Sequence, residues 1–246
     1  MATTLYSIPY SPWSMRARWA LDHHRIPHRS REWVPLLTEP VLRARLLHRG
    51  PMSAPCLVSD GEVIVDSFAI ARWAEQHGSG TPLMPEEYGR AVQTWEDLSQ
   101  RMTAAGRELV TARLLGDPAA LAENVPGSPT GILRPVGSAI GRLGATFIKR
   151  RYDLGQTSGA AQVGIIRAGL SAFADALRDR PYLLEGFSWA DIAMACALNV
   201  VEPVDHPTVR LGERSRVAWS NPDLAIQFRP LLEWRDRIFA EHRDRR

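Results

Sequence analysis

The sequence has almost no lysine, and this shortage narrows the range of possible functions. Lys149 is the single lysine among 30 basic residues, so arginine supplies nearly all of the positive charge. The net charge is only +3, and the arginines alternate with acids except at residues 149–151 and 243–246. Because nucleic-acid binding relies on concentrated positive charge, we expect no nucleic-acid partner. Such a preference for arginine is typical of a GC-rich genome.

Cysteine is also scarce, and histidine does not form a ligand pattern. Cys56 and Cys196 both stand in apolar runs, which favours two buried thiols over a disulfide or a metal pair. His23 and His24 are neighbours, and neighbouring helical side chains point about 100° apart, so both cannot face one ion. We therefore expect no metal.

Long apolar runs are missing as well. No segment of about 18 apolar residues occurs and the N-terminus is polar, so we expect neither a membrane span nor a signal peptide, and a cytoplasmic protein. A length of 246 residues suits one large or two ordinary domains. Turn-forming residues crowd between positions 79 and 87. We predict a first domain at 1–78, a linker at 79–89 and a second domain at 90–246.

Ser11 stands where a predicted strand is followed by a helix. Residues 4–8 are β-prone, and apolar residues recur at helical spacing after Pro12. Helix N-termini present unpaired N–H groups that favour negative charge, so Ser11 could hold a thiolate there. The alternative is that Ser11 only caps the helix, with Pro12 at the first helical position.

Two further segments stand before a strand and before a helix. If the Ala54–Pro55 bond after Ser53 is cis, the backbone of Ala54 can pair with a peptide ligand like an added strand. A hairpin signal around Asp60-Gly61 then leads to Asp66 and Ser67. These two residues either cap the next helix or bind an amino-acid head group. In the second case Asp66 holds the ammonium, and Ser67 holds the carboxylate.

Residues 6–22, 53–55 and 66–75 together resemble the thioredoxin-like domain of a glutathione transferase. Residues 187–192 are similar to the capping motif of that family's helical domain, in which Ser188 and Asp191 are structural. The resemblance implies that Ser11, followed five residues later by Arg16, stabilises the glutathione thiolate. It also implies that Ser53, Ala54, Pro55, Asp66 and Ser67 bind glutathione.

The sequence departs from the family pattern before Pro55 and leaves two roles open. The family usually has an Asn-Pro-containing run with a lysine, arginine or glutamine there, whereas residues 48–55 place the uncharged Ser53 opposite the glycine carboxylate. His48 or Arg49 could replace the missing charge. The tyrosine-type members use a tyrosine near the end of the first strand, so Tyr6 or Tyr10 could also replace Ser11, although strand alternation favours packing for Tyr6.

The second half of the sequence is predicted to be helical. Apolar residues from 91 to 112 repeat at steps of four and three, which indicates one long helix, and further helices are expected near 159–177, 188–201 and 230–242. Residues 116–144 are rich in glycine and proline without a sustained period, so we expect a lid or a surface excursion. Candidates to line a second-substrate pocket are Trp13, Trp95, Met102 and Arg113.

These expectations describe a homodimeric detoxification enzyme that uses glutathione as substrate or cofactor. Its N-terminal domain is an α/β thioredoxin-like unit with a mixed four-stranded sheet, and its C-terminal domain is all-α. The thiolate attacks a small, largely apolar electrophile. A glutathione-dependent isomerase or lyase and a non-catalytic binding protein of the same fold are the alternatives. Because some GC-rich bacteria use other thiols, the identity of the host thiol stays open.

Overall fold

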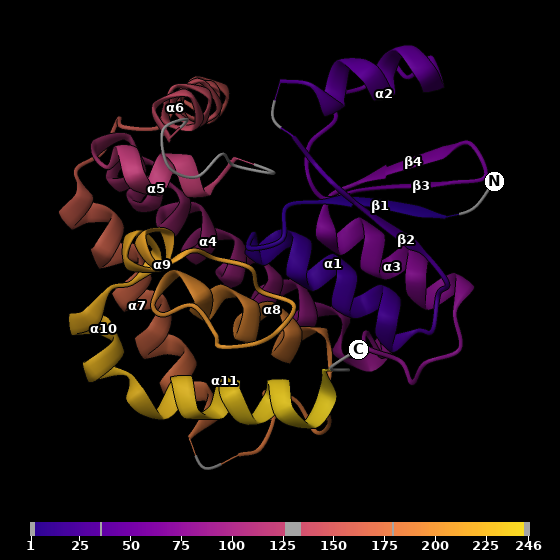
Figure 1. Cartoon of the computed structure of the whole chain (residues 1–246). Coiled ribbons are helices and arrows are strands. Elements are labelled where there is room, and N and C mark those ends of the chain that lie inside the picture. The colour runs from indigo at the N-terminus through magenta and orange to yellow at the C-terminus, as the bar shows by residue number, and fades with distance from the viewer. Residues whose placement is uncertain (1–2, 35, 126–133, 179, 244–246) are drawn as a thin grey trace.

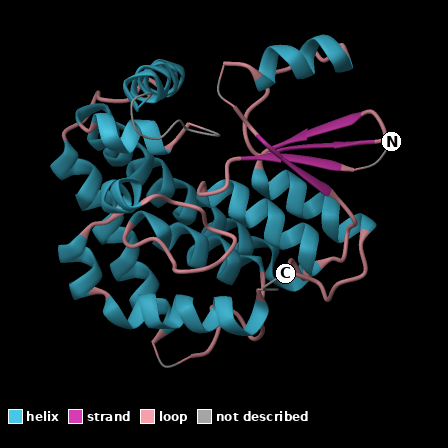
Figure 2. Ribbon diagram, viewed as in Figure 1, coloured by secondary structure: helices cyan, strands magenta, loops and turns pink. Residues whose placement is uncertain are grey.

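A computed structural model describes residues 3–34, 36–125, 134–178 and 180–243. Figure 1 shows a small sheet with its helices beside a larger group of helices formed by the rest of the chain. Among the described residues, all strands belong to the N-terminal part of the chain, as Figures 1 and 2 show together. The expected order, an α/β unit followed by an all-helical unit, is confirmed.

The sheet is mixed and has four strands, as predicted. Its strands β1 (Thr4–Ser7), β2 (Arg29–Glu32), β3 (Cys56–Ser59) and β4 (Glu62–Val65) lie in the order β2-β1-β3-β4. β1 runs parallel to β2 and antiparallel to β3, and β3 is antiparallel to β4. Asp60 and Gly61 turn between β3 and β4 with φ values of 47° and 89°, the positive angles that this tight turn requires.

Helices cover both faces of this sheet. α1 (Pro12–His23) and α3 (Ser67–His77) pack on one face, where Leu5 and Leu57 meet Leu21 and Ile70. α2 (Thr38–Leu46) lies on the other face, where a second cluster forms around Met52. Figure 1 shows α2 alone above the sheet and α1 and α3 below it. Residues of β1 therefore alternate between two cores, as the period of a strand demands.

Strand register brings three connecting segments to one edge of the sheet. Tyr6 pairs with Cys56 across β1 and β3, and Cys56 pairs with Val65 across β3 and β4. The chain therefore leaves β1, enters β3 and leaves β4 at the same edge. These are the segments that carry Ser11, the residues 53–55, and Asp66 with Ser67.

The remaining helices form the larger unit. They are α4 (Gly89–Gly116), α5 (Pro118–Glu123), α6 (Arg134–Arg151), α7 (Gly159–Leu177), α8 (Trp189–Ala197), α9 (Glu213–Trp219), α10 (Pro222–Gln227) and α11 (Arg229–His242), with 3-10 turns η1 (Glu86–Tyr88) and η3 (Leu198–Val200). α4 is the expected long helix. The helices predicted near 159–177, 188–201 and 230–242 correspond to α7, to α8 with η3, and to α11.

The gap between α3 and α4 coincides with the predicted linker, but the core does not stop there. The largest apolar cluster joins Trp19 of α1 and Ala71 of α3 to buried residues of α4, α7, α8 and α11. The first helices of the α/β unit thus pack directly on the helical unit. The division at residues 79–89 stays a prediction.

The segment at 116–144 holds more regular structure than its composition indicated, because α5 and part of α6 occupy described residues of it, while a lid or a surface excursion stays a prediction. Gly141 of α6 lies so close to α5 that an added Cβ would stand 2.3 Å from the Leu121 carbonyl oxygen. Gly141 permits this approach, and glycines hid the helix because they carry no apolar side chain. The part of the segment at 126–133 lies outside the described residues.

Asp191 closes the start of α8 as the sequence predicted. Its Oδ2 accepts the Ser188 N–H at 2.9 Å and the Ser188 hydroxyl at 2.9 Å, while Oδ1 accepts the Leu183 N–H at 2.9 Å. Burial raises the pKa of the Asp191 carboxyl to about 6, against the opposing effect of these hydrogen bonds. Asp191 is fully buried, so water could not accept these hydrogen bonds if the carboxylate were removed.

We expect Asp191→Ala to lower the free energy of unfolding by roughly 3 kcal/mol, because buried N–H groups lose their acceptor and the helix loses its cap. Urea denaturation followed by circular dichroism measures this loss. Asp175→Ala on the exposed side of α7 is the control and should change stability by less than about 0.5 kcal/mol. Equal effects of the two changes would contradict the assignment.

Candidate functional site

Ser11 occupies the N-cap position of α1 without using its side chain as a cap. Pro12 begins the helix, and the Met15 N–H donates to the Ser11 carbonyl at 2.9 Å, but the Ser11 hydroxyl makes no capping hydrogen bond. The nearby Ser14 is fully buried and its hydroxyl accepts the Ile8 N–H at 3.0 Å. The Ser14 hydroxyl is thus occupied by a backbone N–H, whereas the Ser11 hydroxyl lies at the positive end of the helix without a capping hydrogen bond.

The bond between Ala54 and Pro55 is cis, which is the isomer that the peptide-binding interpretation requires. The turn before it is tied to α6, because Arg151 donates to the Met52 carbonyl at 2.7 Å and to Glu39 of α2 at 2.9 Å. Ser53 and Ala54 are partly exposed at the sheet edge. They lie where the sequence placed them, and their role in binding stays a prediction.

Asp66 caps α3 and adopts an unusual backbone conformation. Its Oδ1 accepts the N–H groups of Phe68 at 2.8 Å and Ala69 at 3.3 Å, and its side chain is exposed. Its φ of 85° is unfavourable for a residue with a Cβ and costs roughly 1–3 kcal/mol. Strain of this kind concentrates at functional sites, and the carboxylate keeps its second oxygen outside the cap.

Ser67 begins α3 with its hydroxyl covered. The residue is fully buried, and its oxygen has no hydrogen-bond partner among the described residues. A buried polar group without a partner costs about 1–3 kcal/mol, so this hydroxyl is a candidate for a bond that only a ligand completes. The structure brings Ser67 to the same edge as Ser11 and Ala54.

Neither tyrosine that could replace Ser11 is placed for that task. Tyr6 packs in the cluster beneath α2, on the face of the sheet away from α1. Tyr10 packs edge-on against Trp219, with ring centroids 6.1 Å apart, and burial raises its pKa to about 12. The Tyr10 ring is thus taken up by packing against the helical unit, whereas Ser11 stands at the start of α1 without a capping bond, so the structure favours Ser11.

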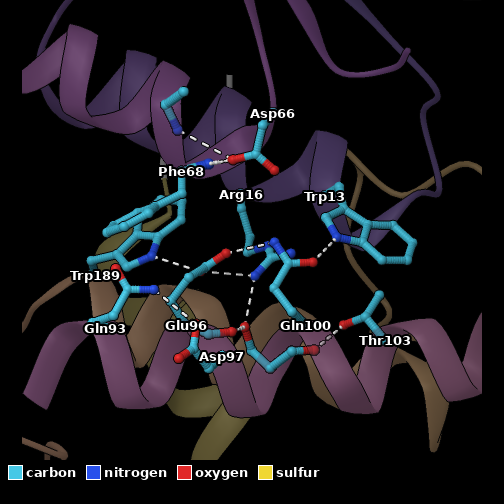
Figure 3. Close-up of polar contacts among 12 residues, drawn as sticks. Trp13, Arg16, Asp66, Phe68, Gln93, Glu96, Asp97, Gln100, Thr103 and Trp189 are labelled. Carbon is cyan, nitrogen blue, oxygen red and sulfur yellow. Dashed lines mark hydrogen bonds and ion pairs between the residues drawn. The ribbon is translucent and has the colours of Figure 1, made fainter. Parts of the chain in front are cut away.

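A buried carboxylate joins α1, α4 and α8 directly behind these residues (Figure 3). Glu96 of α4 accepts the Arg16 guanidinium at 3.1 Å and the Trp189 indole N–H at 2.9 Å, both on Oε2. Its Oε1 accepts the Gln100 amide at 2.6 Å, and Arg16 also donates to the Ser99 hydroxyl at 2.7 Å. Arg16 and Glu96 are 0% and 3% exposed, so water does not weaken this pair.

The same network reaches both helix starts of the site. Trp13 of α1 donates its indole N–H to the Gln100 carbonyl oxygen at 2.5 Å. Phe68 of α3 stacks on Trp189 with ring centroids 5.7 Å apart. Figure 3 shows Trp189 and Trp13 on opposite sides of the Arg16–Glu96 pair, with Asp66 above it. The positions of Ser11 and Asp66 are thus coupled through one buried anion.

Three of the four residues proposed to line a second-substrate pocket have structural partners instead. Met102 is fully buried in the helical core, and Trp95 packs edge-on against Phe173 in that core. Arg113 donates to the carbonyl oxygens of Ala218 and Ser220, both at 2.9 Å, at the end of α9. Of the four candidates, Trp13 alone lies beside Ser11. The apolar seam of α4 faces α7 and α8, whereas a different side of α4 faces α1.

The sequence analysis missed Glu96, Gln100 and Arg107, which form the face of α4 toward α1. These residues recur at steps of four and seven, a helical spacing that marks one face. The signal was present, but it lay in polar residues, whereas the apolar seam was the pattern that predicted packing. Polar residues at helical spacing opposite an apolar seam ordinarily indicate a solvated face.

The described residues contain no group of three or more histidine, cysteine, aspartate or glutamate side chains arranged to hold a metal ion. In the same part of the chain, none of the helices has the length and apolar character that crossing a bilayer requires. Cys56 and Cys196 are both buried as free thiols, and burial raises the pKa of each to about 12. Neither thiol is placed to act as a nucleophile.

We expect Glu96→Gln to lower the free energy of unfolding by ~3 kcal/mol or more, because Arg16 is left as a buried charge without a counter-ion. Guanidinium-chloride unfolding monitored by tryptophan fluorescence gives the value. Asp97→Asn, on the exposed side of the same turn, is the matched control and should be close to neutral. A neutral result for Glu96→Gln would show that this pair does not hold the two units together.

Sequence comparison matches both halves of the chain to one family. The model described as "Glutathione S-transferase, N-terminal domain" matches residues 10–77, and that described as "Glutathione S-transferase, C-terminal domain" matches residues 141–237. The first match contains Ser11, Ala54 and Asp66. No curated protein sequence matches the chain.

Solved structures resemble the chain over nearly its full length. A glutathione S-transferase from Methylobacterium radiotolerans, in complex with glutathione sulfonate, is 20% identical with a TM-score of 0.61, over 98% of this chain and 92% of that one. A glutathione S-transferase from Methylobacillus flagellatus with glutathione bound is 21% identical, with a TM-score of 0.56, over 98% and 96%. A β-etherase from Sphingobium sp. is 16% identical, with a TM-score of 0.61, over 98% and 96%. At these identities the similarity concerns the fold.

Proposed function

Because the chain belongs to the glutathione transferase family, we propose that it binds glutathione at the sheet edge and ionises its thiol beside Ser11. The observation that carries this proposal is the Ser11 hydroxyl, which stands at the N-terminus of α1 without a capping bond. Structural neighbours crystallised with glutathione or its sulfonate support the choice of ligand.

Ser11 supplies the thiolate with a hydrogen bond, and the end of α1 supplies a favourable field. An ordinary cysteine thiol has a pKa of about 8.5 and is mostly neutral at pH 7. Lowering that value by two units requires about 2.7 kcal/mol of preferential interaction with the anion. A charge-assisted hydrogen bond contributes about 1.5–3 kcal/mol and a helix terminus about 0.3–1 kcal/mol, so the two together reach this value.

The zwitterionic head of glutathione is the part that Asp66 and Ser67 recognise. Asp66 offers a carboxylate oxygen to the ammonium while its Oδ1 remains in the cap of α3. Ser67 offers its unpartnered hydroxyl to the carboxylate at the positive end of the helix. Ala54 pairs with the peptide backbone. Ser53 brings no charge to the glycine end, which His48 or Arg49 then approaches from the preceding loop.

The reaction is a thiolate attack on a small, largely apolar electrophile. The sulfur forms a bond to an electron-poor carbon, the leaving group departs with the electron pair of the broken bond, and the thiol proton passes to solvent. Isomerisation or elimination would use the same thiolate with addition followed by loss of the sulfur. A protein that binds glutathione without turnover is the other alternative, and the uncharged Ser53 favours it.

Ser11→Ala should slow the conjugation of 1-chloro-2,4-dinitrobenzene about 10- to 1000-fold at pH 7, because the thiolate loses its donor. The defect should shrink toward pH 9, where the thiol ionises unaided. Steady-state rates of chloride displacement across this pH range measure both effects. Tyr10→Phe is the control and should keep the native rate. A rate lost in Tyr10→Phe and kept in Ser11→Ala would transfer the role to the tyrosine.

Glutathione affinity tests the role of Asp66 separately from its role as a cap. Asp66→Asn keeps an oxygen for the N–H groups of Phe68 and Ala69 but removes the charge, so the dissociation constant should rise roughly 10-fold or more with little change in melting temperature. Asp66→Ala should lower both affinity and melting temperature. Isothermal titration calorimetry and thermal unfolding report the two quantities. Native affinity in Asp66→Asn would restrict the residue to capping.

A further inference from the structure

Arg107 of α4 lies between two aromatic rings beside the proposed thiol site. Its guanidinium carbon is 3.7 Å from the ring centroid of Tyr152 and 5.0 Å from that of Trp13. Trp13 belongs to the first turn of α1, and Tyr152 directly follows α6. These rings hold the cation by its faces, which leaves the edge of the guanidinium, with its N–H groups, for an acceptor.

No described residue supplies that acceptor. Arg107 forms no hydrogen bond or ion pair with a described residue, and its Nε is buried without a partner. All other arginines that are not exposed in the described ranges donate to a protein oxygen; they are Arg16, Arg18, Arg43, Arg113, Arg216, Arg235 and Arg243. Arg107 is thus the exception among them.

The neighbouring acid Glu108 acts on the Arg107 charge from a distance, but it makes its hydrogen bonds elsewhere. Glu108 uses Oε1 for the Gly155 N–H at 2.9 Å and Oε2 for the Gln162 amide at 2.7 Å, on the side of α4 that faces α7. Burial lowers the pKa of the Arg107 guanidinium from its ordinary value, against the opposing effects of Tyr152 and Glu108. The two rings stabilise the cation through its faces, but they do not satisfy its N–H groups, which are left for a ligand.

The order of contacts along α4 places Arg107 toward the mouth of α1. Arg16 binds Glu96, and Trp13, three residues nearer the start of α1, binds Gln100. The Trp13 ring then lies against Arg107, two turns further along α4. Along α4, the residues from Glu96 to Arg107 therefore contact α1 progressively closer to its N-terminus, beside which Ser11 lies. Figure 3 shows the first part of this path, from Arg16 to Trp13.

We infer that Arg107 binds a carboxylate on the second substrate, so that the preferred electrophile is an acidic aromatic compound. This inference rests on the proposed function for the thiolate. The planar guanidinium donates two parallel N–H···O bonds to a carboxylate, and Trp13 offers a flat surface for the ring that bears it. The largely apolar electrophile expected from the sequence then becomes one with a charged end.

A matched pair of substrates tests this inference. 4-Chloro-3,5-dinitrobenzoate and its methyl ester react by the same step, because the thiolate displaces chloride from the same ring carbon and chloride leaves with the bonding electron pair, although the ester activates the ring more strongly. The native protein should show a KM at least 10-fold lower for the acid than for the ester. Arg107→Met should remove this preference by raising the KM of the acid, while kcat and the ester change less than about 3-fold. Arg107→Lys should restore part of it.

Arg101→Met is the control variant, since Arg101 lies on the exposed side of the same helix. It should keep the native preference. Equal losses for acid and ester in Arg107→Met would show that Arg107 only braces Trp13 and Tyr152, and an unchanged preference would show that it takes no part in recognition. Either result overturns the inference.

Binding without glutathione separates this inference from the proposed function. Calorimetric titration with 4-chloro-3,5-dinitrobenzoate alone involves no reaction. It therefore measures the binding of the acid at Arg107 even if the protein fails to bind or activate glutathione. The native protein and Arg101→Met should bind the acid, and Arg107→Met should bind it at least 10-fold more weakly. Absence of binding to the native protein, or equal binding to Arg107→Met, contradicts an anion site at Arg107. Absence of glutathione binding and of conjugation contradicts only the proposed function.

Discussion

The buried pair between Arg16 and Glu96 is the constraint on which the site depends. Helices α1 and α3 belong to the sheet, whereas α4 and α8 belong to the helical unit, and this pair with its satellites joins them. A buried ion pair often adds little net stability, because both charges lose their water. The pair instead fixes how α1 and α4 are arranged, since any displacement of α1 along α4 would leave a charge unpaired in an apolar interior.

That arrangement decides which chemistry is available at the sheet edge. Arg16 fixes α1 five residues after Ser11, and Phe68 on Trp189 fixes α3 two residues after Asp66. The proposed thiol site and the proposed head-group site therefore share one support. The same contacts leave Trp13 against Arg107, so the surface beside the proposed thiol site carries an aromatic ring and a cation without a hydrogen-bond partner among the described residues. A site of this kind can select its second substrate by charge.

Much of this could be predicted from sequence, because local rules fix it. The Asp60-Gly61 turn, Pro12 at the start of α1 and the Ser188–Asp191 cap each depend on a few neighbouring residues. The positions of Ser11, Ala54 and Asp66 followed from the family resemblance, and the strand register explains why they share one edge.

What could not be predicted depends on contacts between distant segments. Trp95, Met102 and Arg113 were candidates because the first helices of the second domain face the thiol in the family that the sequence resembles, but neither that resemblance nor helical spacing reveals which neighbour each face of α4 meets. Arg107 shared the polar helical spacing of Glu96 and Gln100, but that spacing could not reveal its environment, which is made by Trp13 of α1 and by Tyr152 just after α6. Helix α6 was missed because glycine packs closely without apolar side chains.

The pKa of the thiol of glutathione bound to the native protein tests the central claim most directly. Thiolate absorbance near 240 nm, followed across pH with the ligand at saturation, gives this value. Support from Ser11 and the end of α1 predicts a pKa at least one unit below that of free glutathione measured in the same buffer. An unshifted pKa in a complex that binds glutathione tightly would contradict the account, because the sulfur would then lie away from the helix.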